Sequence, residues 1–385
     1  MEQSHNLFQA AQLMGSSAWQ SFFRLALPMA RPALAVGVAL VAMETVADFA
    51  TVDYFAVPTL TTAVYDTWLG YGSLSAAAKL SVLILLVVFT MVGVERFARR
   101  KQALYQQGVQ DAGQFKYQLK GWRKWAVFSY CTMLLATGFL IPFLILVNYS
   151  YHYFEQSWHD EFWQLSINSL MVATIVSITC VLLALLLMFV KRVSPYRQDL
   201  LPSRLVSTGY ALPGTVLAIG VLAPLTYIDF AINDIYQWLG MKGPGLLFTG
   251  SLAALVIAFT VRFAAIAIGS IENRYKTMSP SYDMAAMTMA QKPWQLFYRI
   301  HLPLLRKAMF VGALLVFIES MKELPAALLL KPIGFENLAT YVFQYVSDEQ
   351  LEQGALAAIV IVLVGLFPLI YLNKSIEQNY ADVNH

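Results

Sequence analysis

Charged residues are scarce in this sequence. Asp, Glu, Lys and Arg together make up 13% of the 385 residues, while hydrophobic residues make up 58%. Soluble domains carry about 25% charged residues, so this chain has too few charges to cover a water-facing surface of its length. The composition excludes a chain of soluble domains and predicts a polytopic membrane protein, whose 14% aromatic content fits Trp and Tyr at the lipid headgroups.

Several other features are missing as well. The only two cysteines, Cys131 and Cys180, each lie in an apolar run, so neither a disulfide framework nor a cysteine metal site is predicted. The net charge of +3 is too small to indicate a nucleic acid partner. No Gly-Lys-Ser or Gly-Lys-Thr sequence occurs, so the chain lacks a phosphate-binding loop. We therefore expect no ATP hydrolysis, no catalytic residue, and no cofactor or metal bound by this chain.

Eight stretches are long and apolar enough to cross a bilayer, which takes about 20 residues per helix. They cover approximately residues 30–56, 74–94, 125–148, 166–190, 205–228, 247–268, 307–330 and 354–372. Lys and Arg gather in the segments after the second, fourth and sixth of these spans, whereas the alternate loops hold only Lys242 and Lys331. Because basic loops stay in the cytoplasm, both termini are predicted to be cytoplasmic.

An internal repeat appears at an offset of 275 residues. Its matching pairs include Ala10 and Ala285, Trp19 and Trp294, Pro28 and Pro303, Gly37 and Gly312, Glu44 and Glu319, and Asp48 and Glu323. Only nine residues precede Ala10, without the basic start and apolar run of a cleavable leader, whereas four predicted spans precede Ala285. The repeat predicts the C-terminal part of a first half at 1–100, a cytoplasmic linker at 101–124, and a complete six-span second half at 125–385.

Each copy of the repeat begins with a short amphipathic stretch directly before a span. In the second copy this stretch covers residues 280–303, where Ser279 or Ser281 can cap a helix, Pro293 interrupts it and Pro303 ends it. Such a helix can dock into a groove of a soluble partner. An interfacial amphipathic helix without a partner has the same pattern, but two copies in register favour docking.

These stretches resemble the cytoplasmic coupling loop of permease subunits in binding-protein-dependent ABC importers. That loop has the pattern Glu-Ala-Ala, three residues, Gly, nine residues, Ile-x-Leu-Pro. The sequence matches it at Gln9-Ala10-Ala11, Gly15, Leu25 and Leu27-Pro28, and again at Met284-Ala285-Ala286, Ala290, Ile300 and Leu302-Pro303. Both copies lack the acid, although Asp283 lies beside its position, and the second also lacks the glycine. The resemblance implies an ATPase contact at Ala10, Ala11, Gly15, Leu27, Pro28, Asp283, Ala285, Ala286, Ala290, Arg299, Leu302 and Pro303.

Two further stretches, residues 44–62 and 321–340, resemble the iron(III)-type permeases, which fuse two six-span halves in one chain. This resemblance implies an all-α polytopic protein with the ABC importer permease fold, in the inner membrane of a bacterium. A periplasmic binding protein would deliver the substrate, iron(III). A cytoplasmic ABC ATPase dimer, which itself binds ATP and Mg²⁺, would supply the energy, so the chain is a transport subunit and not an enzyme.

Five charged residues fall inside apolar stretches: Glu44, Asp48, Glu319, Lys322 and Glu323. A charge at the bilayer centre costs at least about 2.5–3.5 kcal/mol, so we expect these residues to fix the interface between the halves or to line the substrate path. Lys322 can neutralise Glu319 or reach Asp48 of the other copy. One alternative is that these residues contact the substrate directly. Another is that their carboxylates couple an ion gradient to transport in a secondary transporter. A third is that the chain is a permease fragment that does not transport.

Two histidine-containing segments have simpler interpretations. The loop at 149–161 is rich in Tyr, His and carboxylates, which are suitable ligand types for iron(III). Its spacing matches no ligand motif, and an aromatic belt at the lipid headgroups explains its Tyr and Trp. His301 lies between Ile300 and Leu302 and is predicted to be a surface residue of the second amphipathic stretch.

Overall fold

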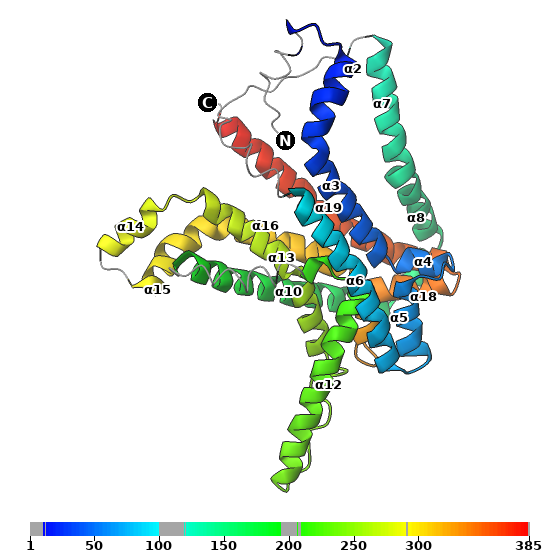
Figure 1. Cartoon of the computed structure of the whole chain (residues 1–385). Coiled ribbons are helices and arrows are strands. Elements are labelled where there is room, and N and C mark those ends of the chain that lie inside the picture. The colour runs from blue at the N-terminus through cyan, green and yellow to red at the C-terminus, as the bar shows by residue number, and fades with distance from the viewer. Residues whose placement is uncertain are drawn as a thin grey trace. The chain divides into compact units, whose positions relative to one another are not determined.

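The computed structural model describes residues 11, 13–99, 119, 121–193, 206, 209–289 and 292–383. Throughout this described part the regular structure is helical, which confirms the predicted all-α fold (Figure 1). The chain divides into two compact units, one from residues 1–46 and 83–142 and the other from residues 47–82 and 143–385. Three helices contribute residues to both units: α3 (Leu27–Ala47), whose last residue belongs to the second unit, α6 (Leu74–Arg99) and α8 (Ile141–His152).

Seven helices of the described part are long and apolar enough to span a membrane. They are Leu74–Val94, Trp122–His152, Asp160–Val193, Gly214–Trp238, Leu252–Thr277, Pro293–Met321 and Leu351–Ile370. An eighth candidate is the pair Trp19–Arg31 and Ala33–Ala47, which bends by 58° at Pro32, where a proline removes a backbone hydrogen bond. The predicted count of eight is reached when this bent pair is taken as one span.

The first unit is built from the N-terminal helices and the helices that follow α6. Besides its share of α6 and α8, it contains α3 as far as Val46, α2 (Ala18–Ser21), the π-helical turn η1 (Phe22–Ala26), α7 (Trp122–Leu135) and the π-helical turn η3 (Ala136–Leu140).

The second unit contains the larger helix bundle. Its elements are α4 (Ala50–Tyr54), α5 (Leu60–Tyr65), η2 (Asp66–Gly70), α9 (Phe154–Ser157), α10 (Asp160–Val193), η5 (Gly209–Ala211), α12 (Gly214–Trp238), α13 (Leu252–Thr277), α14 (Ser281–Thr288), α15 (Pro293–Leu296), η6 (Phe297–His301), α16 (Leu302–Met321), α17 (Pro325–Leu330), α18 (Leu338–Ser347) and α19 (Leu351–Val383). The core lies between α10, α13 and α16, where Val176, Phe259 and Val316 are fully buried. The Ser177 hydroxyl also donates to the Ala313 carbonyl at 2.7 Å and so joins α10 to α16.

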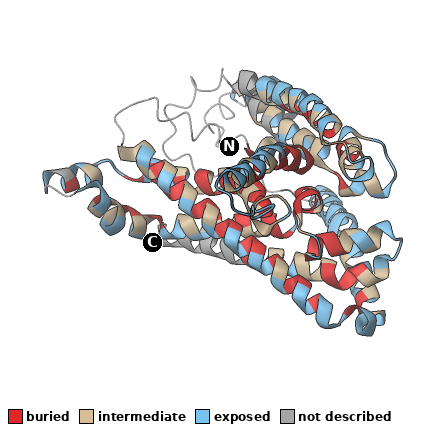
Figure 2. Ribbon diagram, turned by 90° about the horizontal axis from the view of Figure 1, so that it is seen from below, coloured by how far each residue is buried: buried red, intermediate tan, exposed pale blue. Residues whose placement is uncertain are grey.

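The helix α10 illustrates why this bundle suits a bilayer. Val176, Cys180 and Ala184, which recur every four residues, are fully buried, whereas Ile178 and Leu182 on another side are more than half exposed. Figure 2 shows this alternation of buried and exposed residues along the helices. Water would penalise such an exposed apolar face, while lipid would not, so the burial pattern agrees with the membrane assignment.

The internal repeat extends to local backbone structure. Three consecutive elements of the first copy, α2, η1 and α3, begin 275 residues before α15, η6 and α16. The short helices α4 and α17 keep the same offset. The next helices, α5 and α18, both begin with a capping box, made by Thr59 with Thr62 and by Asn337 with Thr340. The sequence identities therefore encode the same succession of helices and turns.

Two predicted spans end earlier than expected. The prediction extended single helices through 30–56 and 307–330, but α3 ends at Ala47 and α16 at Met321, and the short helices α4 and α17 follow. An acidic side chain before each new helix accepts from a backbone N–H of its first turn: Asp48 Oδ1 from Thr51 at 3.2 Å, and Glu323 Oε1 from Ala326 at 3.3 Å. Asp48 and Glu323 thus lie at helix breaks, where they satisfy backbone donors.

The predicted span 205–228 was also placed too early. The helix α12 begins at Gly214, directly after Pro213, and continues to Trp238, with Pro224 inside it. Near its far end, the fully buried Asp229 accepts hydrogen bonds from the backbone N–H groups of Leu247, Phe248 and Thr249. This carboxylate ties the loop before α13 to α12, so part of the predicted outer loop is helical and anchored.

Candidate functional site

The second amphipathic stretch contains two short helices, α14 and α15, before α16. Ser279 accepts a hydrogen bond from the Ser281 N–H at 3.3 Å, which confirms a serine cap at the start of α14. Pro293 is the first residue of α15, as expected of an interrupting proline. The prediction for Pro303 was wrong, because Pro293–Met321 is one continuous candidate span. The π-helical turn η6 ends two residues before Pro303, and its wider hydrogen bonding accommodates a residue that has no N–H to donate.

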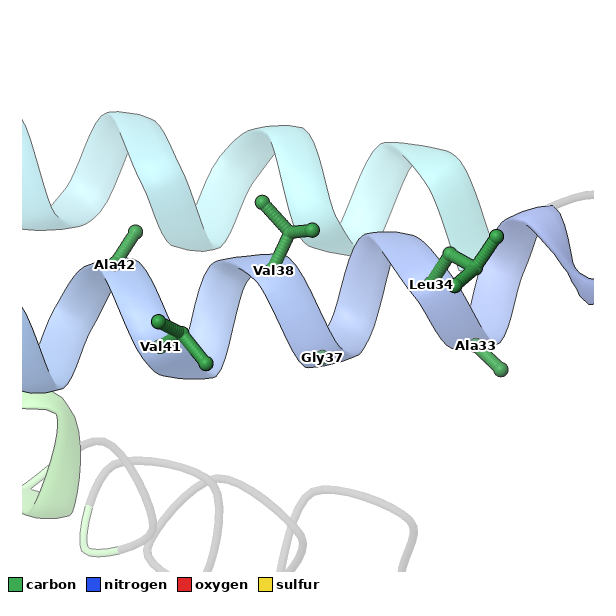
Figure 3. Close-up of a pocket in the computed structure, with 6 residues that line it drawn as sticks. All are labelled: Ala33, Leu34, Gly37, Val38, Val41 and Ala42. Atoms are coloured by element: carbon green, nitrogen blue, oxygen red, sulfur yellow. The ribbon is translucent and has the colours of Figure 1, made fainter. Parts of the chain in front are cut away.

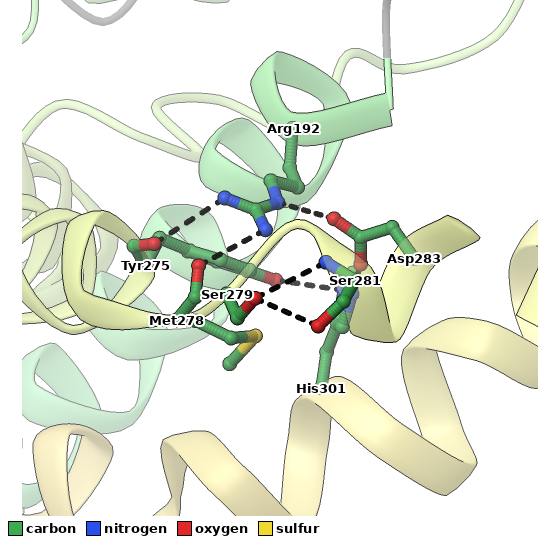
Figure 4. Close-up of polar contacts among 7 residues, drawn as sticks. All are labelled: Arg192, Tyr275, Met278, Ser279, Ser281, Asp283 and His301. Carbon is green, nitrogen blue, oxygen red and sulfur yellow. Dashed lines mark hydrogen bonds and ion pairs between the residues drawn. The ribbon is translucent and has the colours of Figure 1, made fainter. Parts of the chain in front are cut away.

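A polar network fixes the start of α14 to the bundle (Figure 4). The Asp283 carboxylate pairs with Arg192 of α10, Nε to Oδ2 at 2.7 Å, and with His301 of η6, Nε2 to Oδ1 at 2.8 Å. On its other side, His301 Nδ1 lies 3.2 Å from the Tyr275 hydroxyl of α13. Arg192 also donates to the carbonyls of Tyr275 and Met278, both at 3.3 Å. One carboxylate therefore connects three helical elements.

His301 has no exposed surface, so the prediction of a surface position was wrong. Its ring packs against those of Phe189 and Tyr275, with centroids 5.8 and 5.3 Å away. A buried imidazole needs a partner at each nitrogen, and here Asp283 and Tyr275 are those partners. These two partners lie 18 and 26 residues from His301 in the sequence, so no local spacing marks the network.

Large apolar side chains cover the outside of both amphipathic stretches. In the second, Trp294 is 68% exposed and stacks on Phe297 and on the exposed Tyr298. In the first, Trp19 is 72% exposed and stacks on Phe23. Exposed aromatic clusters of this kind are typical of interaction surfaces. We call them the Trp19 patch (Leu13, Met14, Trp19, Phe22, Phe23) and the Trp294 patch (Tyr282, Met284, Met289, Trp294, Tyr298).

The predicted coupling residues differ in their accessibility. Ala10 and Ala290 lie outside the described residues. Ala11 and Ala286 are buried and pack inward; Leu27, Pro28 and Leu302 are half-buried; Ala285, Arg299 and Pro303 are exposed. Gly15 has a φ of +78°, a backbone conformation that favours glycine.

The intramembrane charges fall into two groups. Lys322 contacts Glu319, Nζ to Oε1 at 3.0 Å, which is the local pairing that the spacing predicts. Glu323 pairs with a residue that the sequence analysis missed, Arg262 of α13, Nε to Oε2 at 3.2 Å. The signal for Arg262 was its position as a single charge inside an apolar run, where a charge requires a partner. Of the first-copy residues, Asp48 is half-buried and Glu44 is exposed.

Gly214 leaves room for this ion pair. A Cβ atom on Gly214 would lie 2.3 Å from Glu323 Oε1 and 2.7 Å from Arg262 Nη1. Arg262 Nη1 also donates to the Leu212 carbonyl at 3.3 Å, just before α12. The start of α12, the middle of α13 and the break before α17 thus meet at one buried ion pair.

An apolar groove runs along α3. It is lined by Ala33, Leu34, Gly37, Val38, Val41 and Ala42 (Figure 3). The residue of α16 that corresponds to Gly37 is Gly312, whose added Cβ would lie 3.4 Å from Ala267 Cα of α13. The equivalent glycines therefore have different surroundings: Gly312 of the second copy lies on a packed helix face, and Gly37 of the first copy lines the groove.

The histidines of the loop at 149–161 make local contacts. His152 Nδ1 lies 2.9 Å from the Asn148 carbonyl, and His159 Nδ1 lies 3.0 Å from the Ser157 carbonyl. Trp158 stacks on Phe154. In the described part of the chain, no three His, Cys, Asp or Glu side chains are grouped as ligands for one ion.

Comparison with known proteins identifies the family. The chain is 23% identical over 380 residues to the Fe(3+)-transport system permease protein FbpB 2 of Haemophilus influenzae, an alignment that covers 96% of this chain and 71% of that protein. It is 23% identical over 374 residues to the thiamine transport system permease protein ThiP of Escherichia coli, covering 92% of this chain and 65% of ThiP. A bacterial alginate ABC transporter chain aligns with 64% of this chain and 92% of its own length, at 16% identity and a TM-score of 0.48. The model of the binding-protein-dependent transport system inner membrane component family matches residues 1–103 and 112–382, so the chain belongs to this family of ABC importer permeases.

Proposed function

We propose that this permease forms the membrane path for iron(III), which a periplasmic binding protein delivers and a separate cytoplasmic ATPase drives across the membrane. The iron assignment is supported by the Fe(3+) permease relative, which aligns with 96% of the chain. Thiamine is the competing substrate, because the thiamine permease aligns over nearly the same length. The two substrates differ enough in charge and shape for a transport assay to separate them.

The observation that carries the role of the ATPase is the pair of aromatic patches. The Trp19 and Trp294 patches occupy equivalent places in two copies of one repeat, each directly before a membrane helix. Two equivalent patches suit a dimeric partner that offers the same groove twice. ATP and Mg²⁺ would bind to that partner, in keeping with the absence of a phosphate-binding loop from this sequence.

The orientation follows from the same arrangement. The patches would face the cytoplasm, together with the basic residues at the ends of α10 and α13, such as Lys191 and Lys276. Both termini would be cytoplasmic, and the protein would lie in the bacterial inner membrane.

The intramembrane charges would stabilise the bundle in this permease. Glu319 and Glu323 each have a cationic neighbour, Lys322 and Arg262. Neutralised carboxylates of this kind support a structural role over the rival of ion coupling, which needs carboxylates that exchange protons or ions during transport.

The test is reconstitution with a candidate ATPase and binding protein. The proposal predicts that the ATPase co-purifies with this chain and that proteoliposomes accumulate iron(III) in an ATP-dependent, vanadate-sensitive manner. Uptake of thiamine in place of iron(III) would overturn the substrate assignment alone. Uptake driven by an ion gradient without ATP would overturn the coupling to an ATPase and favour a secondary transporter. Assembly with the ATPase but no uptake of either substrate would favour a non-transporting fragment.

A further inference from the structure

Asp283 occupies the junction of α14 with the rest of the bundle. Its side chain is 17% exposed and accepts from both Arg192 and His301. Arg192 is the penultimate residue of α10, while His301 ends η6 and leads directly into α16. These two helices pack against each other in the bundle core. Any displacement of the start of α14 would therefore act on both helices through one carboxylate.

The chemistry of the contacts defines the roles of the atoms. An ionised carboxylate can only accept, so Nε2 of His301 carries the proton in its contact with Asp283. In the neutral ring Nδ1 is then an acceptor, and the Tyr275 hydroxyl donates to it over 3.2 Å. Every member of the network has a partner, so removal of one member leaves a buried polar group unpaired.

The nearby lysines of α10 and α13 pair with another carboxylate and not with Asp283. Lys191 of α10 and Lys276 of α13 both contact Glu272, at 2.8 and 3.5 Å. This cluster is separate from the carboxylate of Asp283, whose cationic partner is Arg192.

The first copy of the repeat does not encode the same network. At the offset of 275 residues, Asp283 corresponds to Phe8 and His301 to Ala26. The aromatic patch and the π-helical turn occur in both copies, whereas the acid–histidine pair occurs only in the second. The pair is therefore not needed to form the turn, and an additional role in the second copy is implied.

We propose that Arg192, Asp283, His301 and Tyr275 form a polar latch, in which Asp283 and His301 are positioning residues that transmit movement of α14 to α10 and α16. This inference rests on the proposed function, because the movement would come from an ATPase docked on the Trp294 patch. The side chains of Asp283 and His301 are only 17% and 0% exposed, so in this proposal Asp283 contacts the bundle and not the ATPase, which differs from what the family resemblance implies. Loss of the latch should therefore leave docking intact and uncouple ATP hydrolysis from uptake.

The experiment compares His301→Phe and Asp283→Asn with the wild type and with Lys307→Gln, a control at an exposed charge near the start of α16. Three quantities are measured: the ATPase that co-purifies, the ATP hydrolysed per iron(III) ion taken up in proteoliposomes, and the hydrogen exchange of α14 amides in the permease alone. The two latch variants should retain the ATPase, raise the ATP used per ion about tenfold, and speed α14 exchange by about tenfold or more. The control should match the wild type.

A conservative variant separates positioning from folding. His301→Gln keeps a side-chain N–H that can reach Asp283, so it should restore most of the wild-type coupling and exchange, whether or not the phenylalanine variant folds. Wild-type coupling and exchange in both His301→Phe and Asp283→Asn would overturn the latch, and so would a glutamine variant as defective as the phenylalanine variant. If the wild type binds no ATPase, the proposed function fails, while α14 exchange in the permease alone still decides whether the latch holds α14.

Discussion

Arg262 and Glu323 form an ion pair, with Nε and Oε2 3.2 Å apart, at the point where α13 meets the break between α16 and α17. Their side chains are only 12% and 6% exposed. The pair lies among apolar helices, so each charge depends on the other for its stability.

Loss of one partner should be more damaging than loss of both. Arg262→Leu removes the cationic partner of the buried Glu323 and should lower the free energy of unfolding by about 3 kcal/mol. The double variant Arg262→Leu, Glu323→Leu should be closer to the wild type than the single variant is. Thermal unfolding of the detergent-solubilised protein measures both, and equal destabilisation by the single and double variants would contradict the pairing.

The repeat offers a matched pair of glycines for a test of packing. Gly312→Leu should destabilise the protein by about 1–3 kcal/mol, because its new side chain would meet Ser270 and Ala267 of α13. Gly37→Leu is the control, since an added Cβ there has no atom within 4 Å in the described part of the chain. The unfolding temperatures of the two variants should therefore differ. An equal fall in unfolding temperature in both would show that the α3 groove is filled in the solubilised protein.

The two aromatic patches should contribute similarly to binding of the ATPase. Trp19→Ala and Trp294→Ala should each weaken its retention about tenfold or more, because exposed tryptophans dominate interface energetics. Trp238→Ala is the control, since Trp238 is 85% exposed at the end of α12, away from both patches in sequence. Titration of the ATPase onto immobilised permease measures the affinity. Unchanged affinity in both patch variants would argue against docking at these sites.

A carboxyl group within α4 should make stability depend on pH. Partial burial, and secondarily the charge of Asp66, raise the pKa of Asp53 above its ordinary value of 3.8. A raised carboxyl pKa favours the folded state at low pH, and this contribution is lost as the pH rises through the folded-state pKa. Asp53→Asn should therefore remove this loss and stabilise the protein slightly at neutral pH. Unfolding curves measured from pH 4 to pH 7 cover about the range in which carboxyl groups titrate. The free energy of unfolding should decline less with pH in the variant than in the wild type. An equal decline in both would exclude Asp53 as its source.

The sequence predicted the repeated architecture better than it predicted the site. Hydropathy and the repeated motif locate most of the membrane helices, because each depends on residues close together in the chain. The ends of α3 and α16 were missed, since Asp48 and Glu323 looked like charges within continuous apolar runs rather than acceptors at helix breaks. The burial of His301 was unpredictable for a different reason: its partners, Asp283 and Tyr275, come from segments that only the folded bundle brings together.

The π-helical turns η1 and η6 set how the residues before them are rotated about the axis of the following helix. A π-helical turn holds one residue more than the α-helical turn that it replaces, and one residue corresponds to a rotation of about 100° around the helix axis. The turn at Phe297–His301 thus sets the angular position of Trp294 independently of the face that α16 presents to its neighbours. Deletion of a single residue within this turn would keep the composition of the Trp294 patch but rotate Trp294 by about a quarter of a circle.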